Sequence, residues 1–485
     1  MRKMRINFIL PPCELSGGPL AILEYANRFI ERGHDVTVTT YPKKYWPKSW
    51  NEEPFPWFKF NGKVIYGEEK DSALFTKLIK RISKALGNKE QKPLAAFENI
   101  INEASIVSQV ISYMPDCDIN IATFWSTAFA AYFSKKGKPV YFMQHYEEVF
   151  YTNDYYNILM KLAVRMSYEL PLYKVANSSW LQRQIQVKYG QKVPFSNNAV
   201  ELLDFSPRPK KSEKDGIIRI VTFSRPEEWK GFADVVVAMS KIKREYGNRV
   251  QWHVFGREHA YIPPDNGTAP YTLHKGLPFA ELSKLYAECD IAVCASWYES
   301  FPLPPIEAMA SGTAVVTTHE GMEDYCFDGV NCLLVKARDI ESIYNGIKKL
   351  IENPELRKRL ANEGLKTSKE FSWNKAVIER EKILIDILDG AVEYDVFQPL
   401  HLGLVDGNSI PFEKMPLDLM DKFYDGQLIS YNGAIFIISN GCKRHISTAE
   451  LFAQIIEPGT PITEVNGLDF SRIPFGLPIL TKYDI

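Results

Sequence analysis

The chain lacks long apolar runs and paired cysteines, and each absence excludes a class of protein. No window of the sequence reaches the roughly 18 apolar residues that a helix needs to span a bilayer. The apolar run at residues 6–10 is too short for the core of a signal peptide, so we interpret it as a strand. The seven cysteines are odd in number, scattered and without a Cys-x-x-Cys motif. This usage predicts reduced thiols in a cytoplasmic compartment and no zinc site.

The chain also lacks an excess of charge of either sign. Its 58 lysines and arginines nearly balance 59 aspartates and glutamates, which gives a net charge of −1. A chain without net charge has no overall attraction to nucleic acid, so we expect no nucleic-acid partner. The hydrophobic content of 45% is ordinary for a globular protein, and 485 residues are too many for one core. We therefore expect two or three domains.

One stretch combines a buried strand, a loop and a helix start with two acids. The apolar run at 291–295 is short and bounded, as in a buried parallel strand. Pro304 and Pro305 lack an N–H, so we expect them at or before the first turn of the following helix. This interpretation places Glu299 on the strand-to-helix loop and Glu307 in the first helical turn.

Such a loop lies at the carboxyl edge of a parallel sheet, where nucleotides bind in open α/β folds. Two carboxylates eight positions apart at this edge can accept hydrogen bonds from sugar hydroxyls. The alternative is structural: Glu299 is then a solvated loop residue, and Glu307 complements the helix dipole. Spacing alone leaves both interpretations open.

A second loop of this kind carries two cations. The segment at 201–216, rich in charge and containing two prolines, predicts a linker and a domain boundary. A strand at 217–223 follows, and then a loop with Arg225 and Lys230 before a helix that begins at Phe232. Two fixed cations there can neutralise a diphosphate and the charge that it gains as a leaving group. The alternative is a pair of exposed surface bases.

The amino-terminal part contains two further candidates at strand ends. Gly17 and Gly18 separate a strand from a helix, and glycine is needed where the backbone approaches a phosphate closely. His145 and Glu147 follow the strand at 139–143, on the edge that faces a ligand crevice. A lone histidine is often structural, so it is this placement that makes His145 a candidate active-site residue.

Asp116 and Asp118 have the spacing of the Asp-x-Asp metal motif of another fold. They precede their strand, at the edge opposite to ligand chemistry. We therefore interpret them as solvated acids in a turn and expect no catalytic metal.

The amphipathic segment at 74–86 predicts a helix with basic residues around an apolar face. Such a helix can lie peripherally on an anionic membrane surface, or it can pack as an ordinary surface helix.

The carboxyl-terminal residues differ in character from the rest. Residues 427–442 contain two Asn-Gly pairs between β-rich runs, which predicts a hairpin in a small α+β module. Lys443, Arg444 and His445 follow the second pair. They can touch a glycan or an anionic partner, but the pattern favours a solvated hairpin edge.

Taken together, the motifs resemble those of retaining family-4 glycosyltransferases with the GT-B fold, with rhamnosyltransferase-like members closest. The resemblance covers about residues 5–389. Glu-Ser-Phe-Pro-Leu-Pro-Pro-Ile-Glu at 299–307 is similar to the Glu-x7-Glu signature of the family, with Pro302 near a usual glycine position. Ser-Arg-Pro-Glu-Glu-Trp-Lys-Gly at 224–231 is similar to the motif Gly-Arg-Leu-x-x-x-Lys-Gly, and the segment around His145 is similar to the acceptor-side loop.

The resemblance implies a role for each matched residue. Arg225 and Lys230 would grip the donor pyrophosphate. Glu307 would hold the ribose hydroxyls, while Glu299 and His145 would touch the donor sugar near the reaction centre. The remaining expected contacts are donor-binding Gly17, Gly18, Gly256, Leu277, Ser300, Phe301 and Leu303, together with Glu147 on the acceptor side.

The resemblance further implies the fold. We expect an α/β protein of the GT-B fold, with two Rossmann-like, doubly wound domains facing a cleft and a small C-terminal α+β module. The expected parts are an acceptor domain at 1–205, a nucleotide-sugar domain at 206–375, a helix at 376–390 that crosses back to the first domain, and the module at 391–485.

The expected reaction moves a hexose or deoxyhexose from a nucleotide-sugar donor to a glycan or lipid-linked acceptor. By resemblance it retains anomeric configuration, uses no metal or other cofactor and serves cell-surface polysaccharide synthesis. We expect the enzyme in the cytoplasm or at the inner face of the membrane. Two alternatives stay open. One is a nucleotide-sugar epimerase of the same fold, which needs no acceptor, and the other is a non-catalytic glycan-binding subunit.

Overall fold

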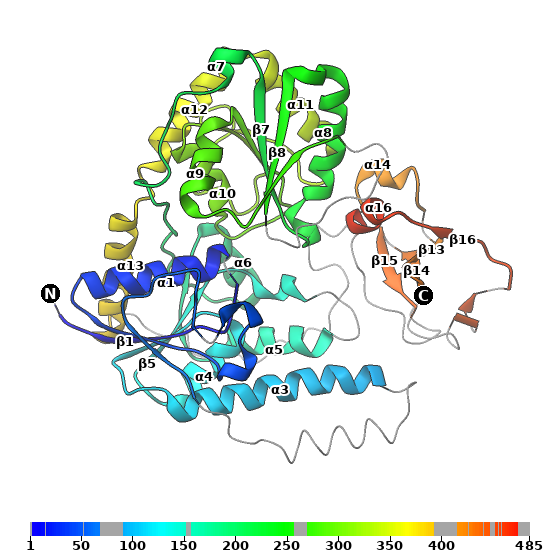
Figure 1. Cartoon of the computed structure of the whole chain (residues 1–485). Coiled ribbons are helices and arrows are strands. Elements are labelled where there is room, and N and C mark those ends of the chain that lie inside the picture. Colours follow the sequence, from blue (N-terminus) through cyan, green and yellow to red (C-terminus); the bar gives the residue numbers. More distant parts are fainter. Residues whose placement is uncertain are drawn as a thin grey trace. The chain divides into compact units, whose positions relative to one another are not determined.

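The chain divides into two compact units, and each is described by itself. The first combines Met1–Ala199 with Trp373–Leu402, and the second combines Val200–Ser372 with Gly403–Ile485. Figure 1 shows the computed structural model, with one parallel sheet in each unit and a smaller sheet near the carboxyl terminus. The structure describes residues 2–14, 16–51, 53–67, 91–151, 157–256, 269–391, 415–424, 426–439, 441–446, 452–453, 455–456 and 458–473.

The first unit is built around a six-stranded parallel sheet in the order β3-β2-β1-β4-β5-β6. This is the strand order of a Rossmann fold. The central strands are apolar and buried along nearly their whole length, as a parallel sheet with two covered faces requires. The strands are β1 (Arg5–Ile9), β2 (Asp35–Thr39), β3 (Lys63–Ile65), β4 (Ile119–Ala122), β5 (Lys138–Met143) and β6 (Tyr173–Ala176).

The helices of the first unit include one from far along the chain. Trp373, at the start of this returning helix, packs edge-on against Tyr25, with 5.0 Å between the ring centres. Glu381, further along it, pairs with Arg32 and accepts from His34 Nε2 at 2.7 Å. The returning helix is therefore part of the core of the first unit. The helices and 3-10 turns are α1 (Gly17–Glu31), η1 (Lys43–Tyr45), η2 (Lys48–Trp50), α3 (Gln91–Tyr113), α4 (Trp125–Ser134), η3 (Glu147–Phe150), α5 (Ile158–Glu169), α6 (Ser179–Tyr189) and the returning α13 (Trp373–Leu388).

The second unit contains another six-stranded parallel sheet, in the order β12-β11-β10-β7-β8-β9. The strands are β7 (Ile218–Ser224), β8 (Val250–Gly256), β9 (Thr272–Lys275), β10 (Ile291–Cys294), β11 (Ala314–Thr317) and β12 (Leu333–Leu334). The helices and turns are α7 (Ser212–Asp215), η4 (Glu228–Lys230), α8 (Phe232–Tyr246), η5 (Gly247–Arg249), α9 (Phe279–Glu288), α10 (Leu303–Ala310), α11 (Ile340–Glu352) and α12 (Pro354–Ser368). Because β7 pairs directly with β10, the loops after these two strands are neighbours.

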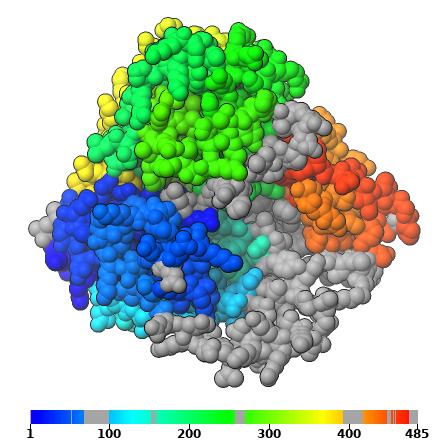
Figure 2. All heavy atoms as spheres, in the orientation of Figure 1, coloured from blue at the N-terminus to red at the C-terminus, as the bar shows by residue number. Residues whose placement is uncertain are grey.

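A four-stranded mixed sheet in the order β15-β14-β13-β16 forms the carboxyl-terminal module, coloured orange to red in Figures 1 and 2. Asn432 and Gly433 have φ angles of 49° and 78°, as a two-residue hairpin turn requires, so the predicted hairpin is confirmed. Phe436, Ile438 and Phe470 pack in its core. The elements are α14 (Leu417–Met420), β13 (Leu428–Tyr431), β14 (Ala434–Ser439), β15 (Cys442–His445), β16 (Ile462–Glu464) and α16 (Gly467–Arg472).

Lys443 of β15 corrects one prediction about this module. Its side chain is fully buried, and its Nζ donates to Glu228 Oε1 at 2.9 Å. A solvated hairpin edge is therefore wrong for this residue, because a carboxylate from the α/β domain of the same unit covers it. Arg444 and His445, which follow on the same strand, are half-buried.

The predicted α/β architecture, two Rossmann-like sheets and a small C-terminal mixed sheet, is confirmed. The predicted amphipathic helix at 74–86 lies outside the described residues. No helix in the described part of the chain is long and apolar enough to cross a membrane.

Candidate functional site

Two loops of the second unit follow β7 and β10, where the strand order of the sheet reverses. In open α/β sheets, ligands bind at such a switch point, outside the carboxyl ends of the strands. The loop after β7 contains η4 and carries Arg225 and Lys230, as predicted. The loop after β10 carries Glu299, also as predicted.

The structure brings Lys230 and Glu299 into direct contact. Lys230 Nζ donates to both carboxylate oxygens of Glu299, at 2.7 and 2.9 Å. Ser296, which the sequence did not single out, donates to the same carboxylate through its hydroxyl at 2.9 Å. Glu299 is only 5% exposed, so these donors replace the hydration that the carboxylate has lost. The surroundings of Glu299 therefore contradict the alternative of a solvated loop residue.

The backbones of the two loops are also joined. The N–H of Trp297 donates to the carbonyl oxygen of Trp229 at 2.7 Å. Gly231 has a φ of +65°, and a Cβ atom at this position would lie 2.0 Å from the carbonyl oxygen of Ala295. Only glycine permits both the left-handed conformation and this close approach. The sequence analysis missed this contact between the two loops, although the glycine directly after Lys230 indicates it.

Arg225 lies at the start of the loop after β7 and is half-buried. Its guanidinium stacks on the ring of Phe223, 5.2 Å from the ring centre, which holds the arginine at the carboxyl edge of the sheet. Gly256 ends the neighbouring strand β8 and accepts from the N–H of Gly276 at 3.0 Å. Leu277 follows, so Gly256 and Leu277, both predicted to contact the donor, lie at this same edge.

Glu307 corrects a detail of the predicted helix. Helix α10 begins at Leu303, so Glu307 is its fifth residue and lies beyond the first turn. The helix can begin before Pro304 and Pro305 because the first four N–H groups of a helix have no intrahelical acceptor. Glu307 is buried, and this burial raises the pKa of its carboxyl to about 8, with the neighbouring hydroxyl of Tyr286 opposing the shift.

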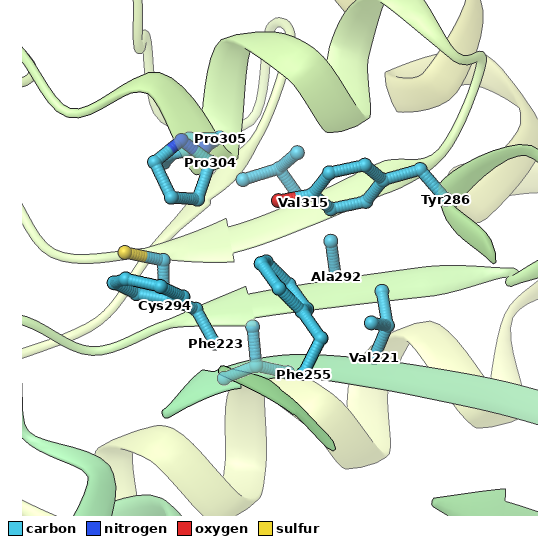
Figure 3. A pocket seen from close by; sticks show the side chains of 10 residues that line it. Val221, Phe223, Phe255, Tyr286, Ala292, Cys294, Pro304, Pro305 and Val315 are labelled. Carbon is cyan, nitrogen blue, oxygen red and sulfur yellow. The ribbon is translucent and has the colours of Figure 1, made fainter. Parts of the chain in front are cut away.

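A small apolar pocket lies between the sheet and helices α9 and α10 (Figure 3). Figure 3 shows the rings of Pro304, Pro305 and Tyr286 on one side, with Phe223 and Phe255 on the other. The side chains that line it are apolar apart from the hydroxyl of Tyr286 and the thiol of Cys294. Tyr286 thus belongs both to this pocket and to the surroundings of Glu307.

The other residues predicted from the resemblance in this loop lie inside the unit. Ser300, Phe301 and Leu303 are all buried. Phe301 packs against Tyr325 and Phe371, with ring centres 5.1 and 5.8 Å away. Its side chain is therefore part of the core. This leaves only the backbone of Phe301 for the predicted contact with the donor.

The candidates of the first unit lie at the carboxyl edge of its own sheet. Gly17 and Gly18 open α1, and a Cβ atom at Gly18 would lie 3.5 Å from Gln144 Cβ. His145 follows Gln144 directly, is half-buried and packs against Phe150 at 5.0 Å between ring centres. The glycine pair and His145 thus share one edge of the first sheet.

The predicted acceptor-side residue Glu147 lies in the interior of the first unit. It is 1% exposed, and its carboxylate accepts from the N–H of Trp125 at 2.7 Å, at the start of α4. Burial raises the pKa of its carboxyl to about 8. These surroundings give Glu147 a capping role within the first unit.

One group of potential metal ligands occurs among the described residues. His319, Glu320 and Glu323 offer ligand atoms that all lie within 4.8 Å of one another, although Glu323 already accepts from the N–H of Gly321 at 2.8 Å. Asp118 pairs at the surface with Arg5 at 2.8 Å, and this pair lowers the pKa of its carboxyl. The side chain of Asp116 is 85% exposed, so both acids remain in contact with solvent, as predicted.

Comparison with solved structures gives the class of fold. The sucrose-phosphate synthase of Thermosynechococcus elongatus aligns with a TM-score of 0.57 over 80% of this chain and 100% of that chain, at 15% identity. Alr3699/HepE of Anabaena, in complex with UDP-glucose, aligns with a TM-score of 0.55 over 80% and 100% of the chains, at 16% identity. The chain has the GT-B fold, as predicted.

Sequence comparison finds a family match in part of the chain. Residues 205–367, which lie within the second unit, match the family Glycosyl transferases group 1. The O-antigen biosynthesis protein RfbC of Myxococcus xanthus is 27% identical over 271 residues, which are 55% of this chain and 20% of that protein. The MMP alpha-(1->4)-mannosyltransferase of Mycolicibacterium hassiacum is 35% identical over 107 residues, 21% of this chain and 26% of that protein. The chain thus spans only a fifth to about a quarter of these two relatives.

Proposed function

We propose that the chain is a glycosyltransferase that uses a nucleotide-sugar donor and a glycan or lipid-linked acceptor, with retention of anomeric configuration. The observation that carries the proposal is the buried pair of Lys230 and Glu299 at the switch point of the second sheet. A fixed cation and a fixed carboxylate at this edge suit the two ends of a nucleotide-sugar, its diphosphate and its sugar.

The matched proteins support the same conclusion. The family assignment covers Arg225, Lys230, Glu299 and Glu307. One relative is named as an O-antigen biosynthesis protein and another as a mannosyltransferase, and a protein of the same fold is seen with UDP-glucose. We therefore propose a role in cell-surface polysaccharide synthesis, at the cytoplasmic side of the membrane.

The mechanism assigns one task to each side chain. Arg225 and Lys230 lie nearest the departing diphosphate and stabilise the negative charge that grows on it, which is the largest electrostatic demand of the reaction. Glu307 accepts hydrogen bonds from the ribose hydroxyls. Glu299, held in place by Lys230 and Ser296, accepts from a hydroxyl of the sugar and fixes its orientation, and His145 meets the sugar from the acceptor side. With two side-chain cations at the diphosphate, we propose that the reaction needs no metal ion.

The test is label transfer by the full chain. Labelled UDP-, GDP- and dTDP-sugars are incubated with a glycolipid extract, and the product is analysed by NMR for its anomeric configuration. We expect transfer from one donor with retention, unchanged by EDTA. Transfer that EDTA abolishes would contradict the metal-independent mechanism, and an isomerised donor in the absence of extract would identify an epimerase.

A control variant separates transfer from contaminating activity. In K230M/E299Q both charges of the buried pair are replaced by side chains of similar size, so the fold is preserved while the grip on the donor is lost. Equal transfer by this variant and by the wild type would overturn the proposed function.

A further inference from the structure

The carboxyl-terminal module reaches the loop of Arg225 and Lys230 through a buried lysine. Lys443 is 0% exposed, and its Nζ donates to Glu228 at 2.9 Å and to the carbonyl oxygen of Phe470 at 2.6 Å. The same ammonium group lies 3.9 Å from the centre of the Phe470 ring. Glu228 is the first residue of η4, the turn that ends at Lys230.

A second buried cation of the module binds to α8, the helix that follows this loop. Arg472, at the end of α16, is 1% exposed and pairs with Asp234 in the first turn of α8. Its remaining N–H groups donate to both carboxylate oxygens of Asp418, at 2.9 and 2.8 Å. Asp234 is fully buried and also accepts from the indole N–H of Trp297 at 2.9 Å.

These contacts connect the module to the Lys230–Glu299 pair from two sides. Glu228 precedes Lys230 by two residues, and Trp297 precedes Glu299 by two residues. The backbone hydrogen bond from the N–H of Trp297 to the carbonyl oxygen of Trp229 joins the two loops. The module therefore contacts the loop after β7 directly, through Glu228, and reaches the loop after β10 through Asp234 of α8. Lys443 and Arg472 themselves are assigned no contact with a substrate.

We propose that Lys443 is a positioning residue, through which the carboxyl-terminal module holds the η4 turn in the geometry that places Lys230 against Glu299. The functional part of this inference rests on the proposed function. The physical reason is desolvation: the Glu228 side chain is only 25% exposed, and a carboxylate so far removed from water moves toward it when it loses its hydrogen-bonded cation. If Lys443 is removed, Glu228 leaves its place, and the turn that ends at Lys230 is pulled with it.

The test uses the full chain and four variants: K443M, K443M/E228Q, R444M and K443R. K443M leaves Glu228 without its hydrogen-bonded cation. K443M/E228Q removes the ion pair without leaving a lone charge, so this double variant still tests the positioning of the turn if K443M does not fold. R444M is the matched control, because adjacent residues of a strand point to opposite faces. Two readouts are taken from each variant: hydrogen exchange of the Lys230, Gly231 and Trp297 amides, and affinity for UDP, GDP and dTDP, each titrated separately.

We expect these three amides to exchange at least ten times faster in K443M, with the amides of β10 unchanged. In K443M/E228Q, where the tie to the module is lost but no lone charge remains, they should exchange faster by a smaller factor. Affinity for the nucleotide that the wild type binds should fall about tenfold in K443M and less in K443M/E228Q, and R444M should match the wild type. K443R should recover part of the affinity, because it restores the cation. Unchanged exchange in the Lys443 variants would overturn the proposed positioning of the turn.

The two readouts keep the two hypotheses apart. Faster exchange with unchanged nucleotide affinity would show that the module orders the turn but does not serve the site, which contradicts the proposal for Lys443. If the wild type bound no nucleotide, the proposed function would fail on its own, and hydrogen exchange would still decide whether the module orders the turn.

Discussion

Lys230 contacts both carboxylate oxygens of Glu299, a residue 69 positions further along the chain, at 2.7 and 2.9 Å. The two residues stand on the loops after two paired parallel strands, and both are largely buried. This relationship gives the candidate site its charge and its rigidity.

Breaking this ion pair on one side should cost more stability than removing both charges. K230M leaves Glu299 buried without its cation, and we expect a loss of about 3 kcal/mol in the free energy of unfolding. K230M/E299Q should lose clearly less, because no lone charge remains in the interior. Urea unfolding of the wild type, both single variants and the double variant measures the coupling. Strictly additive losses would show that the pair is not coupled.

Nucleotide affinity should rise with pH up to about 8 because of Glu307. The pKa of this buried carboxyl is raised to about 8, so it is protonated at neutral pH in the free protein. In the proposed function the ribose hydroxyls donate to the ionised form, so binding should release a proton below this pH. Calorimetry in two buffers of different ionisation enthalpy detects that proton. E307Q should bind more weakly and release none, and a wild type that releases none would contradict the assigned role.

Glu147 should make the protein less stable as the pH rises. Its pKa in the folded state, about 8, lies above the ordinary value of 4.5, so the folded protein binds the extra proton between these values. Stability is then complete below about pH 4.5 and declines toward pH 8, at up to about 1.4 kcal/mol per pH unit. E147Q keeps an acceptor for the Trp125 N–H and should flatten this slope. The same slope in E147Q and the wild type would contradict the buried, protonated carboxyl.

Gly231 should be far less replaceable than a glycine with the same backbone conformation elsewhere. In G231A the new Cβ atom would lie 2.0 Å from the Ala295 carbonyl oxygen, so the two loops must separate. Gly216 has a similar φ of +69° with nothing within 4 Å, and G216A should cost only about 1–2 kcal/mol of conformational strain. Thermal unfolding and nucleotide titration of both variants make the comparison. Equal effects would mean that the close approach of the loops is unimportant.

Local sequence patterns predicted the strands, the loops after β7 and β10 and the hairpin turn at Asn432 and Gly433. Each of these features is determined by residues that are close together in the sequence. The resemblance supplied the pairing of distant motifs. Neither revealed the burial of Lys443 or Glu147, since burial depends on which part of the chain covers a side chain. The start of α10 before two prolines was missed for a different reason: free N–H groups tolerate proline over several positions, so the pattern does not fix the first residue.

The central claim is that the loops after β7 and β10 hold a nucleotide-sugar by its diphosphate. Isothermal titration of UDP, GDP, dTDP and their sugars into the full chain tests it most directly, with K230M/E299Q and the exposed-site control K284A measured alongside. We predict that one nucleotide binds at one site per chain, that K284A binds it equally well, and that K230M/E299Q binds it at least tenfold more weakly. Equal affinity in K230M/E299Q and the wild type, or no binding of any nucleotide, would contradict the claim.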